Sequence, residues 1–395
     1  MSSGLPPGSS DQTRLIHAAS QARPLCRTVG PPIQRGSTVL LPDAAGLYDE
    51  DAGVTYGRAG LSAQAALKEA LASLEGAAGV SLYPSGLSAV SGALLAVLSA
   101  GDEVLVVDTV YKPVRRFCDE VLRRFGVTVT YYDALTTPET LVAGASAAAR
   151  LILMESPGSL TFEMQDVPRI AALARERGIL TALDNTWAAG FLFRPLDHGV
   201  DLSIQALTKY VGGHSDVFMG SVAARDAALV RKLEHGVHHL GWSVAGDDAY
   251  LMLRGLRTLP VRLAAQGEAS LQVAAWLETQ PEVGRVLHPA LPSSPGHQLW
   301  ARDYKGTCGL FAFTLGPASR AAVDAFLDAL QIFGLGFSWG GFESLAIPCD
   351  PQLKRRCFRR DYGGPLVRLH IGLESPDDLV ADLRRGLDAY TKLAG

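Results

Sequence analysis

Residues 203–216, SIQALTKYVGGHSD, decide the fold: an apolar segment is followed by a lysine and then a glycine pair. The run from Leu202 to Leu207 predicts a buried strand, because short apolar runs bounded by turn residues are typical of central parallel strands. Lys209 then lies at the carboxyl end of this strand, at the edge of an open α/β sheet where ligands bind. The stretch therefore predicts a parallel sheet with a ligand site beside Lys209.

A second chemically distinctive residue, Asp184, stands at a similar place. Residues 179–183, ILTAL, predict a strand, and Asp184 follows it, 25 residues before Lys209, as one strand-to-strand repeat would place it. A lysine for an imine and a carboxylate for a pyridinium nitrogen are the minimum protein equipment for pyridoxal phosphate. A lysine after a strand is also commonly a solvated loop residue, so the residues alone leave both interpretations open.

The composition limits the classes of function. The chain has 36 basic and 40 acidic side chains, and this balance argues against a nucleic-acid partner. The first ten residues lack the charged and apolar regions of a secretory signal, and the most apolar span, residues 86–100, is too short to cross a membrane. The five cysteines show no paired or metal-like spacing. We expect free thiols, no metal, no membrane and a cytoplasmic location.

Strands that alternate with helices from residue 62 to 223 predict an α/β fold with a mostly parallel sheet covered by helices on both faces. A single helix is expected over 113–126, with its paired arginines on a solvated face. A long helical pattern over 254–280 leads to a smaller α+β C-terminal domain. The expected division is an N-terminal arm (1–55, with 1–10 disordered), a cofactor-binding domain (56–253) and a C-terminal domain (254–395).

Arg368 stands inside an apolar strand expected over 366–371. Period two puts Arg368 and His370 on one face of this strand and the apolar residues on the other. A buried arginine needs an anionic partner, because an unpaired buried cation is costly. This favours Arg368 as an anchor for a substrate carboxylate.

The segment DNTWAAG, residues 184–190, followed by SIQALTKYVGGHSD resembles the cysteine/methionine-metabolism family of fold-type I pyridoxal phosphate enzymes. The resemblance extends from about Asp11 to the C-terminus. Trp187, together with Trp339 in FSWGGFES, is similar to the cystathionine β-lyase branch. The family resemblance implies a homotetramer in which the N-terminal arm clasps a neighbouring subunit and active sites are shared.

The resemblance also implies which residues bind the cofactor. Lys209 would hold it as a Schiff base, Asp184 would keep the ring nitrogen protonated, and Tyr111 would stack on the ring. The phosphate would be bound by the following groups: the backbone at Gly86 and Leu87, the hydroxyl of Thr208 (or, less favourably, of Ser85), and Tyr56 and Arg58 from the adjacent subunit.

For the reaction, the resemblance implies carbon–sulfur β-elimination from an amino-acid thioether. Arg368 would hold the α-carboxylate, with Ser338 and Trp339 lining the substrate end of the site. Lys209 would take the Cα proton, and Lys209 or Tyr111 would protonate the departing sulfur. From cystathionine the products would be homocysteine, pyruvate and ammonia, a step of methionine biosynthesis.

Three positions depart from the β-lyase pattern and leave the preferred thioether open: Ala59, Arg116 and Phe337. Cystine or another S-substituted cysteine is one alternative substrate. A γ-lyase or γ-synthase of the same family, an aminotransferase on the same fold, and a pyridoxal-phosphate-binding regulator without turnover are alternative functions.

Overall fold

The computed structural model describes residues 6, 8, 10, 26, 28–49, 53–354 and 356–394. Contacts within the chain separate Met1–Pro32 from Ile33–Gly395. Most of residues 1–10 lie outside the described residues, and the expectation of disorder there stays untested. Among the described residues, every helix and strand belongs to Ile33–Gly395.

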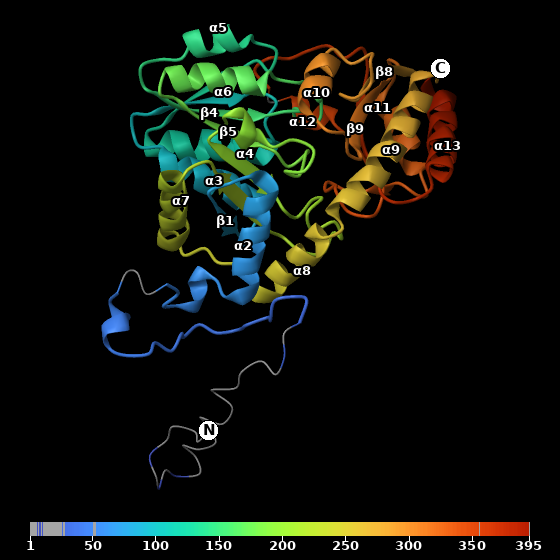
Figure 1. Ribbon diagram of the computed structural model, residues 1–395. Coiled ribbons are helices and arrows are strands. Elements are labelled where there is room, and N and C mark those ends of the chain that lie inside the picture. The colour runs from blue at the N-terminus through green and yellow to red at the C-terminus, as the bar shows by residue number, and fades with distance from the viewer. Residues whose placement is uncertain are drawn as a thin grey trace. The chain divides into compact units, whose positions relative to one another are not determined.

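A seven-stranded sheet forms the centre of the larger part of the molecule (Figure 1). Its strand order is β1-β7-β6-β5-β4-β2-β3. Five neighbouring strands, β6 to β3 in that order, are parallel, whereas β7 runs antiparallel to both β1 and β6. The mostly parallel sheet is therefore confirmed, and the reversal at β7 was not anticipated. The strands are β1 Gly79–Tyr83, β2 Glu103–Val107, β3 Thr128–Tyr132, β4 Ala149–Glu155, β5 Leu180–Asp184, β6 Leu202–Ala206 and β7 Gly220–Ala224.

Helices cover both faces of this sheet, as its alternating side chains require. Val80 and Leu82 of β1 pack with α2 and α8, while Tyr83 of the same strand packs with α3 on the other face. The surrounding helices are α2 Ser62–Glu75, α3 Gly86–Val97, α4 Lys112–Phe117, α5 Pro138–Ala143, α6 Val167–Glu176, α7 Ala227–His239 and α8 Gly246–Leu256. Short helical turns occur at Ala45–Leu47, Gly57–Ala59 and Pro195–His198.

A second, five-stranded sheet follows the long helix α9, Leu259–Glu278 (Figure 1). Its order is β10-β11-β12-β9-β8, antiparallel except for the β10–β11 pair. One face packs against α9, α11 and α13 in a separate apolar core. The elements are β8 Val283–Leu287, α10 His297–Asp303, β9 Leu310–Leu315, α11 Arg320–Asp328, β10 Gly334–Leu335, β11 Leu345–Pro348, α12 Asp350–Leu353, β12 Leu366–His370 and α13 Pro376–Ala394.

Two expected helices are divided in the structure. The segment over 113–126 consists of α4, a π-helical turn at Cys118–Leu122 and a 3-10 turn at Arg123–Phe125. The pattern over 254–280 contains the end of α8 and the whole of α9, with Pro260 in the first turn of α9. Proline lacks an N–H and its ring collides with the carbonyl four residues earlier, so α8 ends before it.

The division into domains by residue number stays a prediction. The expected boundary between residues 253 and 254 falls within α8. Residues 33–49 contain only the turn at Ala45–Leu47 and a single bridge between Thr38 and Tyr56, which suits an extended arm. Arg35 attaches this segment to Asp247 of α8 through a 2.6 Å ion pair. No helix in the described part of the chain is long and apolar enough to span a membrane.

Candidate active site

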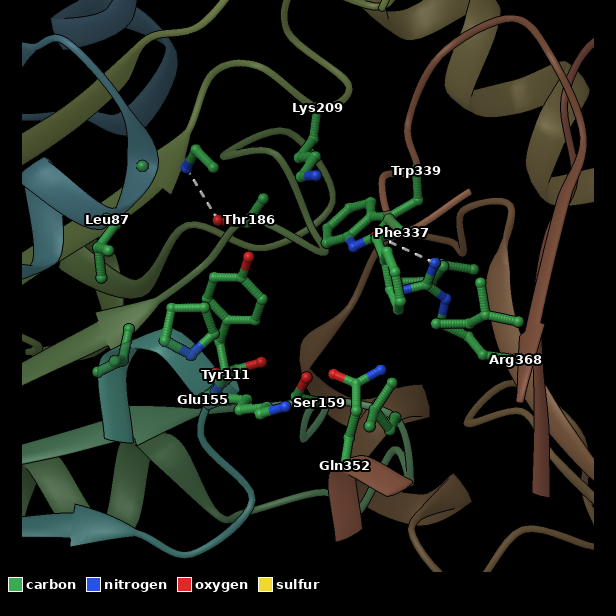
Figure 2. A pocket seen from close by; sticks show the side chains of 18 of the residues that line it. Leu87, Tyr111, Glu155, Ser159, Thr186, Lys209, Phe337, Trp339, Gln352 and Arg368 are labelled. Atoms are coloured by element: carbon green, nitrogen blue, oxygen red, sulfur yellow. Dashed lines mark hydrogen bonds between the residues drawn. The ribbon is translucent and has the colours of Figure 1, made fainter. Parts of the chain in front are cut away.

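A cavity of about 1290 Å³ opens at the carboxyl edge of the parallel strands. Its walls come from the ends of β4, β5 and β6, from the starts of α3 and α4, and from the second sheet (Figure 2). Asp184 and Lys209 both line it, as the positions of their strands predict. Parallel strands end at the same edge of a sheet, which is why two residues 25 positions apart meet here.

Lys209 lies three residues after β6, and its backbone N–H donates to the Ala206 carbonyl at 3.1 Å. Its Nζ donates to Ser338 Oγ at 2.9 Å and lies 5.2 Å from the centroid of the Trp339 ring. Burial, reinforced by the positive charge of Arg368, lowers the pKa of the Lys209 amine to about 8, although Asp184 opposes the shift. A substantial fraction of this amine is therefore neutral near physiological pH, as a nucleophile or base requires.

Asp184 ends β5 and is held by a short polar network. Its carboxylate accepts hydrogen bonds from the backbone N–H and the hydroxyl of Thr186, at 3.1 and 2.5 Å. The same hydroxyl accepts the N–H of Ala206 at 2.9 Å, which joins the ends of β5 and β6. Burial raises the pKa of the Asp184 carboxyl, while the Thr186 hydrogen bonds and Lys209 oppose the shift.

Glu155, which ends β4, is a second partly buried carboxyl beside Asp184. It pairs with Asp184 in the register of the two strands and accepts the backbone N–H of Tyr111 at 2.7 Å. Burial and the proximity of Asp184 raise the pKa of Glu155 well above its usual value. Glu155 was not among the predicted site residues, although its place at a strand end, like that of Asp184, is a signal in the sequence that could have identified it.

Tyr111 projects into the cavity, and 47% of its surface is exposed (Figure 2). Burial and the negative charges of Glu155 and Asp184 raise the pKa of its hydroxyl. The hydroxyl is therefore protonated near neutral pH. The exposed ring is available to stack on a flat ligand, and its hydroxyl is available to donate a proton.

The N-terminus of α3 forms another wall. Gly86 and Leu87 are its first two residues, so their N–H groups have no acceptor within the helix. A Cβ added at Gly86 would lie 2.4 Å from Ala206 Cβ, so only glycine lets the helix start approach β6 this closely. Free N–H groups at such a helix start form a ready site for a phosphate.

The two hydroxyls considered for the same phosphate are already engaged. Ser85 caps α3 by accepting the Ser88 N–H at 3.1 Å. Thr208 donates to the Met219 carbonyl at 3.1 Å and accepts the Met219 N–H at 3.0 Å. Both residues line the cavity, and their contact with phosphate stays a prediction.

The second sheet contributes Arg368 from β12. This side chain is 5% exposed, and its Nη2 donates to three backbone carbonyls, those of Gly336, Phe337 and Ser338. Its Nε is buried without a hydrogen-bond partner, and no carboxylate of the described residues forms an ion pair with it. Burial lowers the pKa of the guanidinium to about 10, so it remains charged at neutral pH.

The predicted tryptophans take different positions. Trp339 lines the cavity and packs at 5.5 Å against the Tyr210 ring, next to Lys209. Trp187 lines the same cavity from the turn after β5. It is 5% exposed, and its Nε1 donates to the Leu310 carbonyl of β9 at 3.1 Å. Ser338, Trp339 and Arg368 therefore come together with Lys209.

Tyr56 and Arg58 do not line this cavity. Tyr56 is 51% exposed, and the Arg58 guanidinium lies 5.8 Å from the centroid of its ring. A role in the site of an adjacent subunit is compatible with this exposure and stays a prediction. Of the three departures from the β-lyase pattern, Arg116 and Phe337 line the cavity.

The expectation of a solvated face for the paired arginines was wrong at Arg115. Its side chain is buried and forms an ion pair with Asp108, while its guanidinium lies 3.7 Å from the centroid of the Tyr131 ring. Asp108 also accepts the backbone N–H groups of Cys357 and Phe358 from the C-terminal region. Its sequence neighbour Arg116 is exposed, as expected.

The residues around the cavity fit pyridoxal phosphate. Lys209 supplies a partly neutral amine, the Tyr111 ring a flat surface and the start of α3 a phosphate cradle. Asp184 is partly buried and has no cationic side chain in ion-pair contact among the described residues; a protonated ring nitrogen would provide that charge. The donor set therefore matches each part of the cofactor.

Comparison with known proteins gives the same family. A model of the Cys/Met metabolism PLP-dependent enzymes matches residues 12–388. The chain is 46% identical over 365 residues to a cystathionine beta-lyase of Bordetella avium, covering 90% of this chain and 91% of the relative. It is 40% identical over 385 residues to cystathionine beta-lyase MetC of Escherichia coli, covering 95% and 97%.

A solved structure of a related protein has the same fold. Cystathionine gamma synthase from Xanthomonas oryzae pv. oryzae, in complex with cystathionine, has a TM-score of 0.85 and 34% sequence identity, covering 92% of this chain and 94% of the other. Both central features of the sequence interpretation, the fold and the cofactor, are thereby confirmed. The chain belongs to the Cys/Met metabolism family of pyridoxal-phosphate-dependent enzymes.

Proposed function

We infer that the protein is a carbon–sulfur lyase that converts cystathionine to homocysteine, pyruvate and ammonia. The observation that carries this inference is the similarity, at 46% and 40% identity over nearly the whole chain, to proteins named cystathionine beta-lyase. The cavity supports it, because a partly neutral amine, a protonated phenol and a buried guanidinium converge there.

Each residue has a separate task in this proposal. Arg368 binds the α-carboxylate of the substrate, since its buried cation has only carbonyl partners in the described chain. Bound pyridoxal phosphate supplies an electron-withdrawing ring that stabilises negative charge at Cα. Asp184 would hold the ring nitrogen of the bound cofactor in its protonated form, because a carboxylate favours a nearby positive charge.

Proton transfers belong to Lys209 and Tyr111. The neutral Lys209 amine takes the proton from Cα. The Cβ–S bond then breaks, and its electron pair leaves with sulfur. The thiolate takes a proton from Lys209 or from the Tyr111 hydroxyl, and water hydrolyses the remaining three-carbon unit to pyruvate and ammonia. Ser338 positions the Lys209 amine through their 2.9 Å hydrogen bond.

We further propose a cytoplasmic homotetramer with shared sites. Tyr56 and Arg58 are outside the cavity of their own chain, and their exposure leaves them available to a neighbouring cofactor phosphate. The five cysteines are all free thiols, which suits a reducing compartment. Sedimentation of Arg58→Ala and measurement of its cofactor affinity test this proposal; a fully active monomer contradicts it.

The test of the activity is incubation of the purified holoenzyme with L-cystathionine. Pyruvate is measured with lactate dehydrogenase and NADH, and homocysteine by thiol titration and mass. Equal amounts of both products are expected, and Lys209→Ala should form neither. Release of 2-oxobutyrate in place of pyruvate would indicate γ-elimination, and the absence of any oxo acid would contradict the lyase function.

A further inference from the structure

Two carboxyl groups, those of Glu155 and Asp184, stand side by side at the cavity. They end the neighbouring parallel strands β4 and β5 as register partners, and both line the cavity. Neighbouring strands lie about 4.8 Å apart. Neither carboxyl forms an ion pair with a cationic side chain of the described residues. Two negative charges this close disfavour each other, so one of the two groups is expected to keep its proton.

The hydrogen bonds indicate which carboxyl is the charged one. Asp184 accepts two, from the backbone N–H and the hydroxyl of Thr186, and the positive charge of Lys209 also favours its ionised form. The Glu155 carboxyl accepts one within the described chain, from the Tyr111 N–H at 2.7 Å. Donors and cations stabilise the ionised form of a carboxyl, so Asp184 is the better anion and Glu155 the better acid.

The positive charge of Arg356 opposes a proton on Glu155, but this side chain is engaged elsewhere. Its two terminal nitrogens donate to the Thr161 hydroxyl at 2.7 Å and to the Ser159 carbonyl at 2.5 Å. Burial and the negative charge of Asp184 outweigh the effect of Arg356 and raise the pKa of Glu155 well above its usual value. Glu155 is therefore neutral near pH 7.

The hydrogen bond from Tyr111 to Glu155 lies where α4 begins. Tyr111 is the residue that precedes the helix, and its side chain makes no capping hydrogen bond. Figure 2 shows Glu155 and Tyr111 on the same wall of the cavity. Glu155 thus ties the end of β4 to the start of α4, and this contact fixes the backbone from which the Tyr111 ring projects.

We propose that Glu155 is a positioning residue of the cofactor site and acts as a neutral carboxylic acid. Its carbonyl oxygen holds the backbone of Tyr111, whose ring is assigned to the cofactor. Its lack of charge leaves Asp184 as the anion for the ring nitrogen. The inference rests on the assignment of Tyr111 and Asp184 to the cofactor, and it is independent of which thioether the enzyme prefers.

Glu103, at the start of β2, is a matched control. This carboxyl is 8% exposed and does not line the cavity. Burial raises its pKa, but hydrogen bonds from Ser146 and Thr130 outweigh burial and lower the pKa overall. Glu103 is therefore a buried glutamate that its donors keep ionised, in contrast to Glu155.

Three substitutions separate the charge of the carboxyl from its hydrogen bond. Glu155→Gln keeps the carbonyl acceptor without a charge, Glu155→Leu removes both, and Asp184→Asn makes the isosteric change at the neighbouring carboxyl. The dissociation constant of pyridoxal phosphate from each holoenzyme is measured by equilibrium dialysis. It should rise roughly 2- to 12-fold in Glu155→Leu, the effect of one hydrogen bond, and Glu155→Gln should recover most of this loss. Asp184→Asn should lose more than about tenfold, because its bond to the ring nitrogen is charged.

Infrared difference spectroscopy detects the proton itself. Near neutral pH the unmodified holoenzyme should show the C=O band of a protonated carboxylic acid that is absent from Glu155→Gln. Glu103→Gln should keep this band and lose a carboxylate band instead. The inference is overturned if Glu155→Gln loses only a carboxylate band, or if it binds the cofactor as weakly as Asp184→Asn.

A double-substitution cycle tests whether Glu155 acts through Tyr111. Glu155→Leu should weaken cofactor binding less in a Tyr111→Ala background than in the unmodified protein, because the ring that it positions is already missing. Losses that simply add would remove the positioning role. None of these measurements uses a thioether, so their failure is distinguishable from a failure of the proposed lyase function.

Discussion

Replacement of Arg368 by lysine tests the substrate anchor most directly. The variant keeps the positive charge but loses the planar fork that binds a carboxylate through two N–H groups. In the structure, Nη2 is held by three carbonyls, and Nε is buried without a partner. A carboxylate that reaches the free side of the guanidinium satisfies this donor. Lysine cannot donate to both the carbonyls and two carboxylate oxygens from the same position.

The expected loss follows from the hydrogen bonds removed. One hydrogen bond to a charged group contributes about 1.5–3 kcal/mol. Since each 1.4 kcal/mol is a factor of ten, kcat/KM for cystathionine should fall by roughly 10- to 150-fold. The loss should appear chiefly as a raised KM, because the carboxylate is bound equally before and during the reaction.

The assay is steady-state pyruvate release, with cofactor content checked by absorbance. Arg285→Lys in β8 is the control, because Arg285 is exposed on the same sheet and does not line the cavity. Its kinetics should match those of the unmodified enzyme. An Arg368→Lys enzyme within twofold of the unmodified kcat/KM, or one with reduced kcat at unchanged KM, would refute the anchor role.

Three further predictions concern protonation and stability. The rate at which cofactor-free protein rebinds the aldehyde cofactor, measured by stopped-flow absorbance, should rise with pH around pH 8. The reason is that the pKa of Lys209 is about 8 and only the neutral amine reacts. A rise centred near pH 10.5 would contradict the lowered pKa. Glu75 is fully buried, and burial raises its pKa from 4.5 to about 7, so its contribution to the free energy of unfolding is present at pH 4.5 and is lost as the pH rises through 7. Glu75→Gln should remove up to about 3 kcal/mol of this pH dependence, measured by urea unfolding. A pH dependence equal to that of the unmodified protein would contradict the raised pKa of Glu75. Arg115→Met should cost about 3 kcal/mol by leaving Asp108 buried without its cation, and adding Asp108→Asn should recover part of the loss; equal stability of all three proteins in urea would show that the pair is unimportant.

The sequence predicted those parts of the site that depend on a strand end. Asp184 and Lys209 each follow an apolar run, and the geometry of parallel strands brings such positions to one edge. The residue period of β12 likewise separated Arg368 and His370 from Val367, Leu369 and Ile371, which pack in the second apolar core. These predictions succeeded because each rests on local chain geometry.

Features that depend on contacts between distant segments of the chain could not be predicted from the sequence. The pair Arg115-Arg116 contains one buried and one exposed arginine, and no local pattern distinguishes them. The difference comes from Asp108, whose carboxylate also binds the backbone at Cys357 and Phe358, 249 and 250 residues away. The reversal of β7 has the same origin, because its direction is set by pairing with β1 and β6 and not by its own apolar residues.

The period-two arrangement of β12 also explains how the second sheet shapes the site. Arg368 binds the carbonyls of residues 336–338, while His370 Nε2 accepts the Gly340 N–H at 3.0 Å. Burial lowers the pKa of His370 to about 3, so the ring stays neutral and can act as this acceptor. A Cβ at Gly340 would lie 2.8 Å from the Lys209 carbonyl carbon, so the loop crosses the lysine backbone at a distance that only glycine permits. Two polar residues on one strand face thus fix both ends of the segment that presents Ser338 to Lys209. The position of the Lys209 amine therefore depends on the second sheet as well as on the seven-stranded sheet that Lys209 follows.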